Sequence, residues 1–335
     1  MSGMAMPKDR TAPAENTVII GLNACVVTVT GDTPQVLVVR PDPGAKLPAT
    51  DALPFGPFEP VHHRTLEIGL RNLVQAQTRV SLGYVEQLYT FGDRGRHVLE
   101  PGEGPRVVSV GYLALTRADS GAAAGRWRSV YDFFPWEDWR QARPAFIDAV
   151  IRPQLEAWAS DGDKSACWDR ARLCFGFDGL HWDEEKVLER YELLYEAGLV
   201  LEARRDGRAL PPSAPEASEQ ARFGEAIQFD HRRILATGMG RLRGKLKYRP
   251  VVFEVMDAAF TLLDLQRTVE AISGIRLHKQ NFRRLVESSG LVERTGKRTS
   301  KAGGRPAEQF RFRREVLRER PAPGVKVPLQ RSARP

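Results

Sequence analysis

Apolar and polar positions recur along the chain with two different periods, and these periods predict the elements of its first part. Apolar, β-branched runs predict strands over Thr17–Val29 and Val36–Arg40. Leucines and valines at helical spacing predict a helix over Thr65–Gln77. Two further strands are predicted over Val85–Phe91 and Arg106–Leu115. The order strand, strand, helix, strand, strand indicates a mixed sheet with helices packed on it.

The middle of the chain has the pattern of a group of helices, over Ala145–Ala159, Lys164–Phe175 and Glu184–Ala197. The last of them runs into Gly198-Leu199-Val200, much as a later helix runs into Gly290-Leu291-Val292. Two interpretations stay open for this likeness. The middle could hold a second winged-helix-like unit, or only a common helix end followed by a strand.

A connection and another helix are predicted next. The stretch Arg205–Gln220 is rich in Pro, Ala and Ser, which indicates a flexible connection. Helical spacing resumes over Phe229–Tyr248. Gly238, Gly240 and Gly244 miss the spacing of a dinucleotide-binding loop by one residue, and no strand precedes them. They are therefore expected to lie within the helix.

Near the C-terminal end two helices follow each other closely. Thr261 and Asp264 have the spacing of a capping box, and the helix that they begin is expected to end at Gly274. A second helix is predicted over His278–Ser289, with Phe282, Leu285 and Val286 facing inward. Its remaining side chains are polar or basic and are left toward solvent.

A hairpin is predicted after these two helices. Its first strand starts at Leu291, a basic, glycine-rich tip runs over Thr295–Pro306, and Gln309–Arg313 returns. Helix, turn, helix and hairpin together indicate a winged helix-turn-helix. In this motif His278–Ser289 is the helix that enters the major groove of DNA.

The charge of the chain supports a polyanionic partner. The net charge is +8, and residues 297–320 contain nine bases against three acids, the composition that phosphate contacts favour. The alternative is a solvated basic tail on an ordinary hairpin. We expect Asn281 and Arg283 or Arg284 to contact base edges, because Arg suits guanine and Asn suits adenine. The full set of candidate DNA-binding residues is Lys279, Gln280, Asn281, Arg283, Arg284, Lys297, Arg298, Lys301 and Arg305.

Composition indicates a globular protein of two or three domains in the cytoplasm. The chain has 335 residues, and no apolar run reaches the length of a membrane span or of a signal peptide core. Cys25, Cys167 and Cys174 have no metal-ligand spacing and are expected to be reduced thiols. His62 and His63 are adjacent with no third ligand nearby, so no metal site is expected.

Several segments resemble a known family. Leu53-Pro54 before the first helix, and the strands within Glu86–Asp93 and Val107–Leu115 after it, resemble the Nudix fold. The second half is more similar to Nudix-related transcriptional regulators, which join a Nudix-like effector domain to a winged helix. The resemblance covers roughly residues 17–135 and 226–314. In the second half it is carried by Phe229-Asp230-His231, Ile234–Thr237, Arg241–Tyr248, Leu265-Gln266-Arg267, Asn281–Arg284 and Gly303–Ala307.

This resemblance implies an α/β (α+β) fold class. The expected architecture is a Nudix-like mixed-sheet α/β/α sandwich with a helical insertion, followed by a C-terminal winged helix-turn-helix domain. The expected boundaries are a disordered lead over 1–15, the Nudix-like domain over 16–135, and the helical insertion with its connection over 136–225. They continue with the closing helix of the Nudix-like domain over 226–249, the winged helix-turn-helix over 250–318 and a disordered tail over 319–335.

The resemblance also implies that the Nudix-like part is not an enzyme. Nudix hydrolases hold divalent metal through glutamates on their helix, because Mg²⁺ prefers oxygen ligands. Glu67 is the only acid on the helix of this chain, and we expect neither catalytic residues nor a cofactor. The positions that align with the charged residues of the Nudix motif are Arg64, Asn72, Leu73, Ala76 and Gln77.

A pocket with arginines in place of acids could bind a phosphorylated ligand without cleaving it. The candidates are Arg40, Arg64, Arg71 and Asp93, although these arginines could equally be solvated. The resemblance implies a nucleotide effector connected with NAD metabolism, such as ADP-ribose, a pyridine nucleotide or ATP. It also implies a homodimeric repressor on a palindromic double-stranded operator. The alternatives are a Nudix-type hydrolase of a nucleoside diphosphate derivative and a protein-binding scaffold that uses the middle helices.

Overall fold

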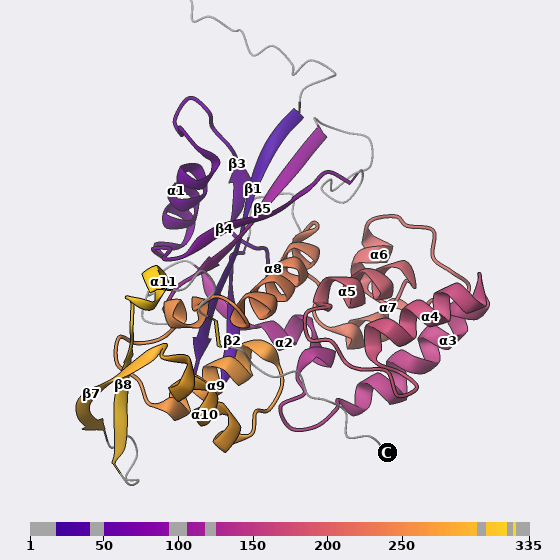
Figure 1. Ribbon diagram of the computed structural model, residues 1–335. Helices are drawn as coiled ribbons and strands as arrows, with labels where there is room; N and C mark the ends of the chain where they lie inside the picture. Colours follow the sequence, from indigo (N-terminus) through magenta and orange to yellow (C-terminus); the bar gives the residue numbers. More distant parts are fainter. Residues whose placement is uncertain are drawn as a thin grey trace, which may run out of the picture.

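The computed structural model describes residues 18–40, 50–93, 106–117, 125–299, 306–319 and 324–325. Its central element is a sheet of six strands (Figure 1), in which β4, β5, β1, β2 and β6 lie side by side in this order and β3 pairs with β1. β1 and β5 are parallel, and the other pairs are antiparallel. The strands are β1 (Val18–Thr30), β2 (Thr33–Val38), β3 (Phe55–Pro57), β4 (Val85–Phe91), β5 (Arg106–Leu115) and β6 (Arg126–Ser129).

The alternation of side chains along β1 explains why the sheet is covered on both faces. Leu22, Ala24 and Val26 are buried on one face, where they pack with Leu70 and Val74 of helix α1 (Leu66–Thr78). Thr65 caps this helix, because its hydroxyl accepts a hydrogen bond from the amide of Ile68 at 3.2 Å.

The opposite face of the sheet is covered by α8 (His231–Leu246). Cys25 and Val27 of β1 point to this face and share a hydrophobic core with Leu235 and Met239 of α8. The helix predicted over Phe229–Tyr248 is thus present. A mixed sheet between α1 and α8 is the expected α/β/α sandwich (Figure 1).

The insertion folds as a helical layer beside α8 (right of Figure 1). Its core is continuous with that of the sheet domain, since Tyr191, Leu194 and Phe175 belong to the same hydrophobic cluster as Met239. After the short α2 (Val130–Phe133) and the turn η1 (Pro135–Glu137), its elements are η2 (Ile147–Ile151), α3 (Arg152–Ser160), α4 (Lys164–Phe175), α5 (Val187–Glu196), α6 (Leu201–Arg205), α7 (Ala217–Gln220) and η3 (Ala221–Phe223).

One expectation about the insertion is wrong. No strand follows Val200, because the chain turns into α6, so neither a second winged-helix-like unit nor a strand is formed there. The segment Arg205–Gln220 is attached to the rest of the fold at both ends, and its flexibility stays a prediction. Gln220 is buried and donates a hydrogen bond to the carbonyl of Gly198 at 2.6 Å. Arg205 donates to the carbonyls of Ile227 at 2.6 Å and Phe229 at 2.5 Å, so this segment is tied to the start of α8.

The C-terminal unit has the order of a winged helix-turn-helix and packs on the same side of the sheet as α8 (lower left of Figure 1). Its core contains Phe253, whose ring stacks on Phe312 at 4.3 Å between centroids, and Phe282. Phe260 pairs with Phe310 and adds a bridge to the hairpin. The elements are η4 (Val251–Val255), α9 (Leu262–Ser273), α10 (Lys279–Ser289), β7 (Val292–Thr299), β8 (Ala307–Phe312) and α11 (Val316–Glu319).

Candidate nucleic-acid interface and effector surface

The helix-turn-helix is built from residues that fix both ends of α9. The hydroxyl of Thr261 accepts a hydrogen bond from the amide of Asp264 at 3.1 Å, and the carboxylate of Asp264 accepts one from the amide of Thr261 at 2.9 Å. This is the predicted capping box. Gly274 ends the helix with φ of 74°, a left-handed conformation that favours glycine.

The turn between α9 and α10 is held by two side chains of α9. Gln266 donates a hydrogen bond to the carbonyl of Leu277 at 3.0 Å, and Glu270 accepts one from the amide of Leu277 at 2.8 Å. The turn therefore moves with α9. The direction in which α10 leaves the turn is set by the position of α9.

Helix α10 divides into an apolar and a polar face. Phe282 and Val286 are buried, and Leu285 is half-buried rather than fully inside. The long side chains on the other face are exposed, and those of Lys279, Gln280, Asn281, Arg283 and Arg284 form no hydrogen bond or ion pair with another residue that the structure describes. They are thus available to a partner. This exposed set contains the candidates Lys279, Gln280, Asn281, Arg283 and Arg284.

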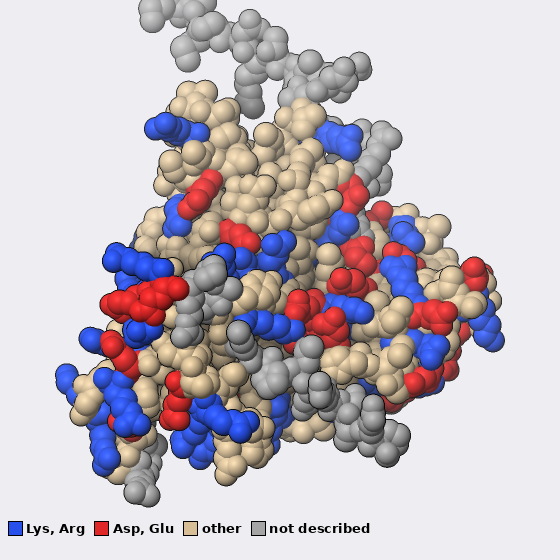
Figure 2. Space-filling model, in the orientation of Figure 1, with Lys and Arg blue, Asp and Glu red and all other residues tan. Residues whose placement is uncertain are grey.

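The wing extends the basic surface. β7 and β8 are antiparallel with a shift in register between Arg294 and Arg298, where Gly296 has φ of 76°. Lys297 and Arg298 are exposed on β7, while Lys301 and Arg305 lie outside the described residues. Blue side chains gather over the hairpin and α10 in the lower part of Figure 2. Helix and wing together present one basic surface, as a DNA interface requires.

The effector candidates do not meet in one place. Arg71 donates hydrogen bonds to the carbonyls of Leu82 at 2.7 Å and Gly83 at 3.1 Å, so it braces the loop after α1. Asp93 forms an ion pair with Arg233 at the start of α8. Arg64 is exposed near the start of α1. These contacts give Arg71 and Asp93 partners within the fold.

Arg40 lies in a cluster that sequence reasoning missed. The carboxylate of Asp51 is 94% buried and pairs with Arg126 of β6 and with Arg128 at 2.8 Å. Arg40 lies 3.5 Å from the same carboxylate and is 60% exposed. Arg126 is 44% exposed. β6 carries both new arginines, and its charged sequence did not read as a strand. Arg40 and Arg126 thus form an exposed arginine pair around Asp51.

The helix positions that align with the Nudix acids have other contacts. Leu73 packs closely against Gly56 of β3. A Cβ atom added to Gly56 would overlap the side chain of Leu73. Gln77 donates a hydrogen bond to the carbonyl of Phe55 at 2.7 Å. Glu67 pairs with Arg71 at 2.9 Å. Among the described residues, no group of three or more His, Cys, Asp or Glu side chains could hold a metal ion.

The comparisons with known proteins give the C-terminal unit a family. Residues 252–312 match the model of the NrtR DNA-binding winged helix domain. This segment is thus similar to the NrtR-type winged helix domain. The ADPR responsive transcriptional repressor NtrR of Acinetobacter baylyi is 38% identical over 101 residues, which are 29% of this chain and 40% of that protein. The chain thus spans about two fifths of the length of this curated relative.

Solved structures support the fold of the whole chain. Shewanella oneidensis NrtR complexed with a 27mer DNA matches with a TM-score of 0.53 and 18% identity, over 89% of this chain and 95% of that one. A second crystal structure of Shewanella oneidensis NrtR matches with a TM-score of 0.52 and 18% identity, over 88% of this chain and 94% of that one. The resemblance to Nudix-related transcriptional regulators and the fold class are therefore confirmed. In the described part of the chain, no helix is both long and apolar enough to cross a membrane.

Proposed function

We propose that this protein is a transcriptional repressor that binds duplex DNA through its NrtR-type winged helix and responds to a nucleotide. The DNA-binding part of this proposal rests on the division of α10 into an apolar and a polar face. Phe282 and Val286 hold the helix in the fold, while the basic and amide side chains of the opposite face are exposed. Such a face can enter a major groove with its side chains free for base edges.

The proposed roles along this surface differ with residue type. Asn281, Arg283 and Arg284 contact base edges, and Lys279 and Gln280 support them at the start of the helix. Lys297, Arg298, Lys301 and Arg305 contact phosphates or a minor groove through the wing. The protein acts as a homodimer, so its operator is a palindrome whose half-sites are about 34–36 Å apart, one turn of DNA, or a multiple of that.

The effector part of the proposal is supported by the name of the Acinetobacter relative, which describes an ADPR responsive repressor. We propose ADP-ribose as the first ligand to test, ahead of pyridine nucleotides and ATP, with genes of NAD metabolism as the targets. Within the sheet domain, Arg40 and Arg126 form the exposed arginine pair that suits a diphosphate. Arg64 and Asp93 are kept as weaker candidates.

The DNA proposal is tested by genomic footprinting with the purified full chain, followed by anisotropy titration of the fragments that it protects. We expect protected sites with two symmetric halves, and an affinity that falls steeply as salt is raised. The mass in solution, measured by light scattering, is expected to be that of a dimer. Protection that is absent at all salt concentrations would overturn the DNA proposal.

The effector proposal is tested by calorimetric titration with ADP-ribose, NAD and ATP. Arg40→Ala and Arg126→Ala are each expected to weaken ADP-ribose binding by about tenfold, because each removes a charged hydrogen-bond donor to phosphate. Arg71→Ala is the matched control. It removes an arginine of the same domain that braces a loop, so it lowers stability and leaves affinity unchanged.

The same samples separate regulation from hydrolysis. We propose that ADP-ribose is bound and not cleaved, and that incubation with Mg²⁺ or Mn²⁺ releases no AMP. Turnover that is lost in Glu67→Gln would favour the hydrolase instead, since Glu67 is the acid that remains on α1.

A further inference from the structure

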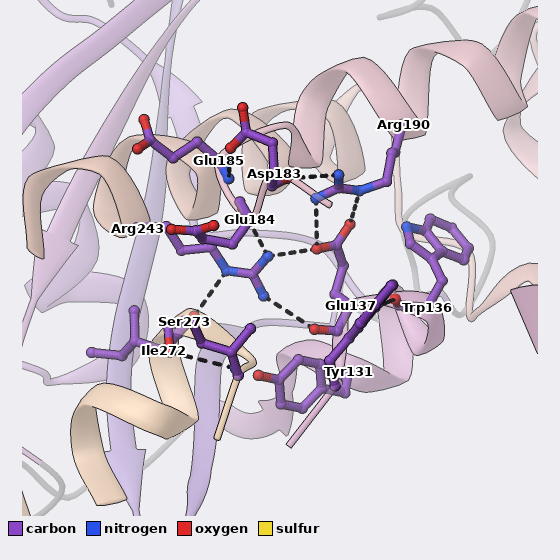
Figure 3. A network of polar contacts seen from close by, with 12 residues as sticks. Tyr131, Trp136, Glu137, Asp183, Glu184, Glu185, Arg190, Arg243, Ile272 and Ser273 are labelled. Carbon is purple, nitrogen blue, oxygen red and sulfur yellow. Dashed lines mark hydrogen bonds and ion pairs between the residues drawn. The ribbon is translucent and has the colours of Figure 1, made fainter. Parts of the chain in front are cut away.

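Three buried charges meet where the insertion, α8 and the winged helix come together (Figure 3). Glu137 of η1 accepts hydrogen bonds from Arg190 of α5 at 2.6 and 3.0 Å. It accepts another from Arg243 of α8 at 2.5 Å. All three residues are at least 98% buried. We call them the junction triad.

The junction triad carries one excess positive charge, because two arginines share one carboxylate. Buried charge is costly unless it is paired. Nearby Glu184 does not supply the missing negative charge in full, since its carboxylate pairs with Lys247 at 3.0 Å. Burial opposes ionisation of Glu137, but Arg190 and Arg243 hold its pKa below the ordinary value. Glu137 is therefore ionised at neutral pH.

The remaining compensation comes from the C-terminus of α9, which carries the negative end of the helix dipole. Arg243 donates a hydrogen bond to the carbonyl of Ile272 at 2.9 Å. The hydroxyl of Tyr131 donates to the carbonyl of Ala271 at 2.7 Å, and the amide of Trp139 donates to that of Gly274 at 2.7 Å. If α9 moved away, Arg243 would lose this compensation while still buried.

Gly274 shows how closely this end of α9 is fitted. A Cβ atom on Gly274 would overlap the carbonyl oxygen of Glu137 and would also crowd Arg243 and the hydroxyl of Tyr131. The turn to α10 begins at the same residue, and Gln266 and Glu270 hold that turn to α9. The junction triad is thus connected to α10 through the C-terminal end of α9 and through the turn that follows it.

Another side of α9 borders an open space. A cavity of about 290 Å³ lies between the β1–β2 turn and the winged helix, and it is lined by Asp32, Val255 and Arg267 among others. Arg267 and Asp32 are 3.8 Å apart and both more than half exposed. The side of α9 that faces the β1–β2 turn is thus less closely packed than its C-terminal end.

We infer that Arg243 and Glu137 are positioning residues that hold the winged helix in one orientation on the sheet domain. They form the pivot about which α10 rotates when the effector binds. The inference rests on the proposed function. It also gives the insertion a role, because Arg190 and the carbonyl of Glu184 complete the site around Arg243. A protein of this fold without the insertion would lack both of these groups.

The test compares two buried ion pairs on the same helix. Arg243→Met removes the junction, whereas Arg232→Met is the matched control. Arg232 pairs with Glu202 at 3.1 Å and is also fully buried, but its polar contacts go to the insertion and to Phe133, not to the winged helix. Hydrogen exchange of residues 271–279 is measured by mass spectrometry in the full chain, together with operator affinity with and without ADP-ribose.

We expect both variants to unfold at lower temperature, but only Arg243→Met to raise exchange at 271–279, by about tenfold or more. Operator affinity is expected to fall in Arg243→Met, and the ratio of affinities with and without ADP-ribose to move toward one. Equal exchange in both variants, or unchanged exchange in Arg243→Met, would overturn the inference. If wild-type protein bound no operator, the proposed function would fail while the exchange result still decided the pivot.

A milder pair of variants covers the case in which Arg243→Met does not fold. Tyr131→Phe removes only the hydroxyl that bonds the carbonyl of Ala271, so exchange at 271–279 is expected to rise about fivefold. Tyr195→Phe is its control, because Tyr195 bonds Asp206 inside the insertion. A rise of the same size in both tyrosine variants, or in neither, would also overturn the inference.

Discussion

Gly238 of α8 lies directly over Cys25 of β1, so closely that a Cβ atom on the glycine would stand 2.7 Å from the sulfur. On the opposite side of the helix, a Cβ atom on Gly240 would stand 2.7 Å from the carbonyl oxygen of Glu185. Glycine is needed at both positions because α8 is held between the sheet and the insertion. The glycines that resemble part of a dinucleotide motif are therefore packing residues.

This contact predicts a coupled pair of substitutions. Gly238→Ala should lower the free energy of unfolding by about 1–3 kcal/mol through overpacking. Cys25→Ala removes the sulfur that the new methyl group would meet, so the double variant should be more stable than the sum of the two single effects predicts. Urea unfolding of the four proteins measures the coupling. Additive effects would mean that the two residues do not compete for space.

The three thiols should differ in reactivity. Burial raises the pKa of Cys25 to about 12, and burial also raises the pKa of Cys174, whereas Cys167 is half-exposed. Thiolate is the reactive form. With a chromogenic disulfide at pH 8, we expect one fast-reacting thiol in the native protein and three after denaturation. Cys167→Ser should remove the fast phase, and two fast thiols in the wild type would contradict the burial of Cys174.

Arg284→Ala should weaken specific operator binding by about 1–3 kcal/mol, because an arginine that contacts guanine with two donors contributes that much. Binding to unrelated DNA should change less, and the preference at one base position should relax. Anisotropy titration with the operator and with a scrambled duplex measures both. Lys164→Ala removes one exposed charge on the insertion and serves as the control. Unchanged affinity would remove Arg284 from the recognition set.

The pH dependence of stability should report Glu137. Its pKa in the folded protein is below the ordinary value of 4.5, so its stabilising effect is complete above that value and is lost as pH falls through the folded pKa. Glu137→Gln should cost about 3–5 kcal/mol near neutral pH, because it breaks a buried pair. The difference from wild type should be constant between about pH 6 and 8 and shrink below about pH 4.5. A difference that grows on acidification would contradict this assignment.

Much of the fold could be predicted because periodicity and capping signals agree along the chain. The strands Val85–Phe91 and Arg106–Leu115, and the helix Lys164–Phe175, have the bounds expected from sequence. Strands β3 and β6 were missed for physical reasons. β3 has only three residues in a proline-rich stretch, and β6 is rich in arginine and is a strand because it pairs with the edge of β2.

The candidate site was predicted unevenly. The exposed face of α10 follows from its own spacing, so the DNA-binding candidates on this helix are exposed as expected. Their role stays a prediction, as do the domain boundaries. The junction triad joins residues 53 and 106 positions apart, which no local pattern connects. One signal was present. Arg190 and Arg243 fall on the apolar stripes of their helices, where a charge needs a buried partner.

The bond from Arg243 to Ile272 spans 29 positions of the chain. During synthesis on a ribosome, Arg243 emerges before the carbonyls that complete its surroundings. A nascent sheet domain would therefore hold an arginine without its full set of acceptors until α9 has left the exit tunnel. The sheet domain therefore completes the surroundings of Arg243 only after α9 has been synthesised.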